Sequence, residues 1–590
     1  MKIKHLFGLA VIAAMTASCS SNEDLGTAGP GTGEAGVGYA TFTINLPTTS
    51  GTRSTQNDQF DGGTASEYAV KDATLLIFEK DGSSENDYKF VEQASLGNLE
   101  PWKKDNTDNN GITTEATITA ELKNAQVGNN DYYALVILNN KDKNNAEKVT
   151  LPTGTTTYGA WNVAATEKNL VDNTNGFYMA NAPEFQITGA EPTTLVKIQG
   201  IYRTKEEAHS KPGTTVHVER GLAKVTVGSN SSSDYFATNG AAVTENKYKN
   251  DVVRITNWAL DVTNNKSFPV HVTSGLKTGL ISTDQTVPAY ADIWNDAVAT
   301  NGTAATSRFV SHPATGAFKR VYWGIDPNYS MGLTDLDKCK EQFTIAEANG
   351  EGNGVTWNDG SGSEKPLYCR ENTFDIQNMK QGQTTRVLLK ATYTPSAVVK
   401  EKDKTFFMIG NSSDIWTVTT LAEQIKSKAE EVLGTTPEVK VTLNDGIKAA
   451  GTHVLDATNV TIKSGEDDKT SVVVGQINTK LGLDANKKIG IKTYKNGESY
   501  YIARIKHFGD DLTPWKAGEE TYGTNNEKYL GRYGVLRNNW YDLTINKISG
   551  PGYPDVPEVK PTDPDDENTK YINVSVKILD WAKRSQSWDL

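Results

Sequence analysis

The feature that most restricts the fold of this chain is a series of short runs rich in Val, Ile, Thr and aromatic residues, separated by clusters of Asn, Gly, Asp and Ser. Clear runs lie at residues 73–78, 132–138 and 386–391. Short strands between such turn clusters are typical of all-β sandwich proteins. Because 590 residues suffice for more than one core, we expect an all-β fold of two β-sandwich domains.

One segment has the spacing of a helix instead. Residues 420–433 begin at Thr420, which with Glu423 predicts a capping box, and Gly434 follows as a stop signal. The apolar side chains on one face are Leu421, Ile425, Val432 and Leu433. This amphipathic pattern predicts a minor helix that packs on the second domain.

The first residues have the layout of a lipoprotein signal. Lys2 and Lys4 precede an apolar stretch at residues 6–15, and small residues lead from there to Cys19. The stretch is too short to span a bilayer. We expect residues 1–19 to form a signal peptide whose Cys19 is lipidated, with palmitate among its acyl chains. An ordinary secretory signal is the alternative.

Composition and motifs argue against several classes of function. The net charge of −12 and the scattered Lys and Arg residues disfavour nucleic acid as a partner. The seven histidines lack metal-ligand spacing, and His217 and His271 are expected on strand surfaces. We predict no catalytic residue, no cofactor, no metal site and hence no enzyme. Cys339 and Cys369 are a possible disulfide pair, which spacing alone leaves open.

Two strands with alternating apolar residues lie near opposite ends of the chain. The residues that share the apolar face are Phe42, Ile44 and Leu46 in the first strand and Ile572, Val574, Val576 and Ile578 in the last. Either strand suits the same groove. Loss of the first strand would leave unpaired backbone groups beside an apolar trench, which invites another strand. Exchange of this kind between identical chains is heterologous and predicts an open filament.

Arg53 is the one basic residue between residues 6 and 70. It lies in a polar segment of small residues, 48–54, of the kind that proteases cut readily. A protease specific for arginine would cut between Arg53 and Ser54 and separate the first strand from the rest of the chain. The alternative is an ordinary solvated loop arginine.

These patterns divide the chain into six parts. They are the signal peptide at 1–19, a propeptide with a spacer and the removable strand at 20–53, an N-terminal β-sandwich at 54–228, a C-terminal β-sandwich with insertions at 229–548, a tether rich in Pro and acidic residues at 549–570, and a C-terminal donor strand at 571–590. We expect the tether to be extended and semi-rigid, and not a packed element.

Several segments, in their order along the chain, resemble a known family. They lie at residues 218–225, 258–264, 322–329, 368–374, 532–541 and 576–581. Together they are similar to the Bacteroidales fimbrilins, also called type V pilins, and most closely to the major subunit of the short fimbriae. The resemblance covers most of the chain.

The resemblance implies a structural subunit of a surface fimbria that supports cell adhesion. Such subunits have two transthyretin-like β-sandwich domains and are exported as lipoprotein precursors that their lipid anchors to the outer membrane. An extracellular Arg-specific protease would cut after Arg53. Identical subunits would then polymerise by donor-strand exchange, together with accessory anchor and tip fimbrilins. The donor residues implied here are Ile572, Val574, Val576, Ile578, Leu579 and Trp581.

Two alternatives fit the same sequence. A surface-anchored glycan-binding lipoprotein would use exposed aromatic rings, and its candidates are Trp102, Trp161, Trp416 and Trp515. It would keep its first strand and its lipid. The other alternative is an anchor or tip fimbrilin. The alternating strand at the C-terminus favours a shaft subunit over both.

Overall fold

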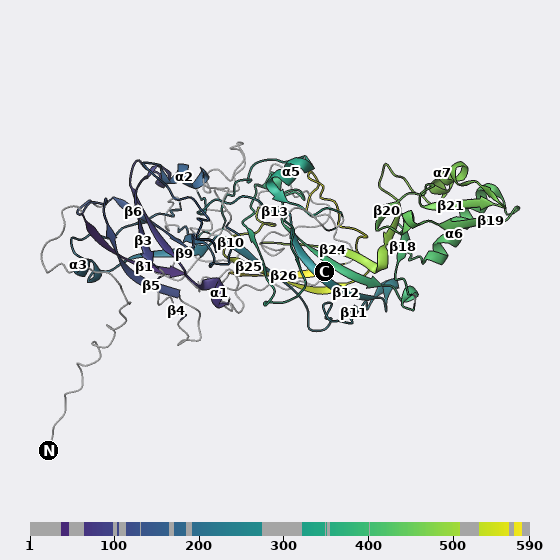
Figure 1. Ribbon diagram of the computed structural model, residues 1–590, viewed down its shortest axis with the longest axis horizontal. Coiled ribbons are helices and arrows are strands. Elements are labelled where there is room, and N and C mark those ends of the chain that lie inside the picture. Colours follow the sequence, from purple (N-terminus) through teal and green to yellow (C-terminus); the bar gives the residue numbers. More distant parts are fainter. Residues whose placement is uncertain are drawn as a thin grey trace, which may run out of the picture.

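The computed structural model describes residues 37–46, 64–97, 99, 103–104, 114–129, 131–164, 170–184, 192–273, 321, 323–348, 350, 354–400, 402–507, 530–565 and 572–580, the last of these for the backbone alone. Within them strands predominate and helices are few and short, so the fold is all-β as expected. The molecule is elongated (Figure 1): a first sandwich at one end, a second in the middle and a smaller unit at the other end.

The first sandwich is built from nine strands in the order β3-β2-β6-β7-β9-β1-β5-β4, with β8 paired to β6. Their bounds are β1 Gly38–Leu46, β2 Ala73–Glu79, β3 Lys89–Gly97, β4 Lys103–Lys104, β5 Thr114–Leu122, β6 Tyr132–Leu138, β7 Met179–Asn181, β8 Val196–Lys197 and β9 Thr214–Arg220. The first half of β9 pairs with β1 and its second half with β7. β9 therefore connects the strands on the β1 side to those on the β7 side, and together they enclose one buried core.

The second sandwich packs a sheet of order β16-β10-β25-β26 against one of order β11-β12-β17-β24, with β15 on β12. The bounds are β10 Leu222–Ser229, β11 Ala241–Ala242, β12 Val252–Asp261, β15 Trp357–Asn358, β16 Leu367–Arg370, β17 Arg386–Thr394, β24 Glu498–Arg504, β25 Asn539–Ile548 and β26 Ile572–Asp580. The short strands β13 Thr263–Asn264 and β14 Phe343–Thr344 pair beside it.

The passage from the first sandwich to the second occurs at Gly221. Only this residue separates β9 from β10, and β10 pairs with β16 and β25 of the second sandwich. The expected domain boundary at residue 228 is therefore wrong by one strand. The amino-acid composition changes at the polar residues after Val227. The chain passes from one hydrophobic core to the other earlier, within an uninterrupted apolar run.

A third unit, residues 407–491, has a hydrophobic core of its own. Its elements are β18 Phe406–Ile409, α6 Val418–Leu433, β19 Val439–Leu443, β20 Gly451–His453, β21 Val460–Ser464, β22 Asp467–Asp468, α7 Thr470–Lys480 and β23 Ile491–Tyr494. β18 connects the two cores, because Phe406 and Met408 face the second sandwich while Phe407 and Ile409 face the third unit.

Helix α6 confirms the predicted helix but corrects its start and its packing. The N-cap is Thr417, and the capping box joins Thr417 to Thr420, so the expected box of Thr420 with Glu423 is wrong. Gly434 ends the helix with a positive φ of 80°, which suits glycine. The buried side chains Leu421 and Ile425 pack within the third unit and not on the second sandwich. Besides α6 and α7, the α-helices in the described part of the chain are α1 Ala65–Tyr68, α2 Tyr158–Ala164, α3 Lys205–His209 and α5 Leu336–Gln342.

Residues 549–565, which we call the strap, contradict the expected tether. Val556 and Val559 are buried, and Asp565 is 1% exposed. The backbones of Tyr553 and Tyr500 exchange two hydrogen bonds of 2.8 Å. The strap thus packs on the sheet that contains β24. Proline and acidic residues are compatible with both an extended tether and a packed segment. The packing here depends on tyrosines of β24, which lie far away in the sequence.

Cys339 and Cys369 are both buried free thiols, so the possible disulfide does not form. Cys339 on α5 packs with Val262 and Phe343 in a small cluster, whereas Cys369 on β16 belongs to the core of the second sandwich. Burial raises the pKa of Cys339 to about 11 and that of Cys369 to about 12, so both stay protonated at neutral pH.

Candidate strand-exchange site

β1 occupies an interior position of the first sandwich. Along its whole length it pairs antiparallel with β5, from Gly38 opposite Leu122 to Leu46 opposite Thr114. On its other side it pairs in parallel with β9, from Phe42 opposite Thr214 to Asn45 opposite His217. Removal of β1 would therefore expose the ladder groups of two strands at once, one on each side of the gap.

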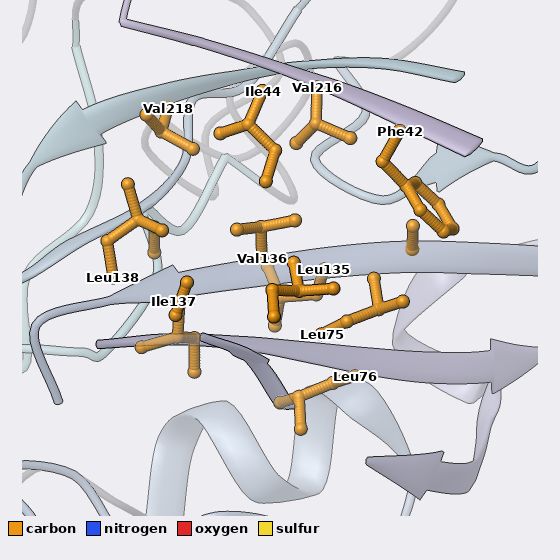
Figure 2. Packing of buried hydrophobic residues seen from close by; sticks show 14 of the residues in the cluster. Phe42, Ile44, Leu75, Leu76, Leu135, Val136, Ile137, Leu138, Val216 and Val218 are labelled. Atoms are coloured by element: carbon orange, nitrogen blue, oxygen red, sulfur yellow. The ribbon is translucent and has the colours of Figure 1, made fainter. Parts of the chain in front are cut away.

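The inner face of β1 is part of the hydrophobic core. Phe42 and Ile44 are 0% exposed and Leu46 is 4% exposed. Figure 2 shows Phe42 and Ile44 in the same layer as Val216 and Val218 of β9, above Leu75 of β2 and Leu135 and Val136 of β6. Burial of these three side chains of β1 contributes roughly 1.5–3 kcal/mol each, or about 5–9 kcal/mol in total.

The outer face of β1 is polar and is partly covered by α3. The Thr41 hydroxyl donates to the Ala208 carbonyl of α3 over 2.9 Å. Further along, the Thr43 and Thr117 hydroxyls lie 3.1 Å apart, and Asn45 donates to the Glu115 carboxylate over 3.0 Å. The two faces thus follow the alternation that the sequence shows. Polar cross-strand pairs of this kind set the register of the strand.

His217 faces Asn45 across the β1–β9 ladder. Burial lowers the pKa of His217 to about 4, so this imidazole is neutral at pH 7. The groove that β1 fills is therefore lined by aliphatic side chains on the inside and by neutral polar groups beside β9. It suits a strand with one aliphatic and one polar face.

The last strand, β26, lies at the edge of a sheet in the second sandwich. It pairs antiparallel with β25, from Ile572 opposite Ile548 to Asp580 opposite Asn539, with one irregularity near Ile545. The backbone of this chain therefore docks its own last strand beside β25. Cys19, Arg53, Ser54, Trp581 and the side chains of β26, including Ile572, Val574, Val576, Ile578 and Leu579, lie outside the described residues.

Buried charges lie at the seam between the two sandwiches, and they were not among the residues expected from the sequence. Glu67 on α1 is 1% exposed and lies 2.8 Å from the Lys224 ammonium of β10. It also accepts a hydrogen bond of 2.5 Å from the Tyr368 hydroxyl, and its carbonyl accepts one of 2.7 Å from Arg220 Nε. Burial alone would raise the pKa of Glu67, but Lys224 and the hydrogen bonds that the carboxylate accepts from Tyr368 and from the Thr64 amide outweigh it and lower the pKa.

This buried cluster fixes α1, the first described helix after Arg53. The chain that follows the expected cut is thereby held at the seam by β10 and β16, independently of β1. The available signal was the pair Glu219-Arg220 and then Lys224 inside an otherwise apolar run. Charged residues in such a run are buried only when they are paired.

His271 corrects another expectation. Its side chain is fully buried, and Nδ1 lies 2.9 Å from the Glu219 carboxylate while Nε2 lies 3.6 Å from that of Glu371. Glu371 also pairs with Arg537 at 3.1 Å. His271 is thus part of the seam and not a strand-surface residue, because Glu219 comes from the first sandwich and Glu371 from the second.

Of the four tryptophans considered for sugar stacking, the two that the structure describes are buried or half-buried. Trp161 is 4% exposed, with its Nε1 bound to the Thr150 carbonyl at 2.8 Å, and Trp416 is half-buried. Trp102 and Trp515 lie outside the described residues. A cleft of about 900 Å³ runs between the strap, the second sandwich and the third unit, and Tyr553 is the aromatic residue that lines it.

Metal sites and membrane-spanning helices are both absent from the described ranges. No group of three or more His, Cys, Asp or Glu side chains could hold a metal ion there. In the same part of the chain, no helix is both long and apolar enough to cross a membrane.

The C-terminal part of the chain matches a known protein family. Residues 492–587 match the family described as major fimbrial subunit protein type IV, fimbrillin, C-terminal. This part of the chain is similar to fimbrillins. The match begins within β23, where the third unit ends, and it includes β24, β25, the strap and β26. No curated protein matches the chain.

Several solved structures of bacterial proteins match the chain at low sequence identity. A putative cell adhesion protein from Parabacteroides distasonis is 10% identical, with 93% of this chain and 99% of that chain covered and a TM-score of 0.34. A fimbrilin (fimA) from Porphyromonas gingivalis is 10% identical, with coverage of 92% and 99% and a TM-score of 0.34. The tip fimbrial protein Mfa3 from the same organism is 9% identical, with coverage of 92% and 100% and a TM-score of 0.26.

Proposed function

We propose that this chain is the structural subunit of a fimbrial shaft on the cell surface, assembled by donor-strand exchange. The observation that carries the proposal is the position of β1. Its apolar face is buried in the core between β5 and β9, and Arg53 follows it seven residues after its end at Leu46. A cut after Arg53 frees β1 from covalent attachment to the rest of the chain.

The last strand is the proposed replacement. β26 carries Ile572, Val574, Val576 and Ile578 at alternate positions, which is the pattern of Phe42, Ile44 and Leu46. Burial of four such side chains in the vacated groove would contribute about 6–12 kcal/mol before ordering costs. It would also restore the hydrogen bonds of β5 and β9. The match of residues 492–587 to fimbrillins supports this role for the C-terminus.

The export route is part of the same proposal. The precursor carries lipid on Cys19, reaches the outer membrane and is cut between Arg53 and Ser54 by an extracellular Arg-specific protease. Its partners are identical subunits, with accessory anchor and tip fimbrilins at the ends of the filament. An anchor subunit would keep β1 and its lipid, and a tip subunit would not need to donate its last strand.

Limited digestion tests the proposal. Treatment of the unlipidated chain with an Arg-specific protease is expected to cut first after Arg53, and filaments should follow in negative-stain micrographs. Arg53→Ala should remain monomeric under the same treatment, while Arg203→Ala serves as the control and should still polymerise. A wild-type chain that is cut after Arg53 and stays monomeric would contradict the proposal.

A further inference from the structure

We propose that the strap is the fixed anchor of the C-terminal strand, and that it stays docked on its own subunit when β26 pairs with another. This inference rests on the proposed function. It assigns a role to Arg504 and Asp565, whose ion pair is the last buried contact that the structure describes before β26. The pull that a neighbouring subunit exerts on β26 then passes through this pair into β24.

The strap is hydrogen-bonded to the second sandwich along its whole length. At its start, the Tyr501 and Tyr494 hydroxyls donate to the carbonyls of Gly550 and Gly552 over 2.9 and 2.7 Å. The Gly552 amide donates to Ser499 Oγ over 2.9 Å, and Tyr553 pairs with Tyr500. A side chain at residue 552 would not fit, because a Cβ there would lie 2.0 Å from the Tyr500 carbonyl oxygen.

Two buried arginines hold the second half of the strap. Arg386 of β17 pairs with Asp261 through Nε at 2.7 Å and donates from Nη2 to the Pro557 carbonyl over 2.7 Å. Arg504 of β24 lies 2.6 Å from Asp565, with side chains that are 9% and 1% exposed. Charge-assisted bonds in such a dry environment are stronger than neutral ones, and loss of one partner leaves a buried charge.

The strap packs on one sheet of the second sandwich, whereas the last strand belongs to the other. The strap bonds described above run to β17 and β24 of the first of these sheets and to β23 of the third unit, while β26 pairs with β25. Opening of the β25–β26 ladder therefore breaks none of these bonds. Apolar contacts add to them, because Val556 packs with Leu388 and Ile502 beneath the strap.

An anchor at Asp565 limits how far the donor strand can reach. Six residues, 566–571, separate Asp565 from Ile572. At no more than 3.3–3.6 Å per residue, the chain from Asp565 to Ile572 spans at most about 25 Å. The groove of the accepting subunit must therefore lie within that distance of Asp565. Subunit spacing in the filament is thereby set by a rigid point and not by a flexible tether.

Hydrogen exchange measured by mass spectrometry on the uncut, monomeric chain tests the anchor without requiring polymerisation. In urea concentrations below the unfolding transition, we expect the amides of residues 572–580 to exchange through local opening of the β25–β26 ladder. The amides of Gly552, Tyr553 and Val556 should exchange at least tenfold more slowly than those of residues 572–580. Equal exchange rates with the same urea dependence would show that strap and strand open together, and would overturn the proposal.

Variants test the ion pair itself. Asp565→Asn keeps the shape of the side chain, and both it and Arg504→Gln should raise exchange of residues 560–565 at least tenfold while the melting transition of the sandwich persists. Lys488→Gln is the matched control, because Lys488 pairs with Glu558 of the strap where the side chains are 78% and 57% exposed. Protection in Asp565→Asn equal to that in the control would overturn the role of the pair.

Filaments separate this inference from the proposed function. If the cut wild-type chain polymerises, filaments of Asp565→Asn should break into shorter pieces than wild-type filaments under the same shear. Equal lengths would reject the anchor and leave strand exchange standing. If the cut wild-type chain does not polymerise while the strap remains protected in the exchange measurement, the proposed function fails and the independent docking of the strap is supported.

Discussion

Single residues decide how the two sandwiches are joined. At the seam, the buried Glu67 and Lys224 pair with each other and the half-buried Tyr368 bonds to Glu67, while His271 lies between the carboxylates of Glu219 and Glu371. The alternation of Phe42, Ile44 and Leu46 is predictable from the sequence, because period-two patterns follow directly from strand geometry. The seam is not, because a buried ion pair forms only when its partners come together from distant elements.

Lys224→Met should destabilise the chain by about 3–5 kcal/mol, because it leaves the Glu67 carboxylate buried without its cation. Denaturant unfolding at pH 7 measures this change. Lys197→Met, which removes an exposed pair with Asp131, is the control and should cost less than about 1 kcal/mol. A loss below 1 kcal/mol for Lys224→Met would contradict the proposed importance of the seam pair.

The same pair predicts a dependence on pH. The folded pKa of Glu67 is lowered from its usual 4.5, so the stability that it contributes is present above pH 4.5 and is lost as the pH falls through the folded pKa. The difference in unfolding free energy between wild type and Lys224→Met should therefore shrink in acid. A constant difference from pH 7 to pH 3 would show that Glu67 is not the group responsible.

At the scale of elements, the sequence predicted the strands and the α6 helix but not the strap or the third unit as a separate core. Helical spacing and Gly434 predict the position of α6. The N-cap is harder to predict, because Thr417 and Thr420 are both threonines and lie only one helical turn apart. The strap resembles a tether in composition. Tyrosines and arginines of β17, β23 and β24 hold it in place, together with the apolar contacts of Val556.

The third unit should be removable, because its ends are adjacent. Ile409 pairs with Ile491 in the β18–β23 ladder, and the Gly410 amide donates to the Gly490 carbonyl over 2.9 Å. Replacement of residues 411–489 by Asn-Gly, with Phe407→Thr and Ile409→Thr to remove exposed apolar surface, should leave a folded chain that is still cut after Arg53. Circular dichroism and thermal unfolding measure the outcome, and loss of the cooperative transition would contradict it.

At the scale of the whole molecule, the chain is an elongated row of units whose two terminal strands occupy different sandwiches (Figure 1). β1 is interior to the first sandwich, and β26 is an edge strand of the second. An edge strand leaves its sheet more easily than an interior one, because only one ladder breaks. In the proposed mechanism, the cut after Arg53 is what allows β1 to leave, whereas β26 can leave its sheet without any cut.

Strand exchange requires the departure of β1, and a disulfide lock tests that step directly. Thr43 of β1 and Thr117 of β5 are opposite each other on the polar outer face, with hydroxyls 3.1 Å apart. Directly opposed cross-strand positions have the spacing that a disulfide requires. The chain with Thr43→Cys and Thr117→Cys should be cut after Arg53 in both redox states.

We expect the oxidised, cut chain to stay monomeric in negative-stain micrographs, because β1 cannot leave. A mild reductant should then release β1 and start polymerisation. The uncut chain should stay monomeric before and after reduction. Filaments that form equally well from the oxidised and the reduced cut chain would contradict strand exchange at this groove.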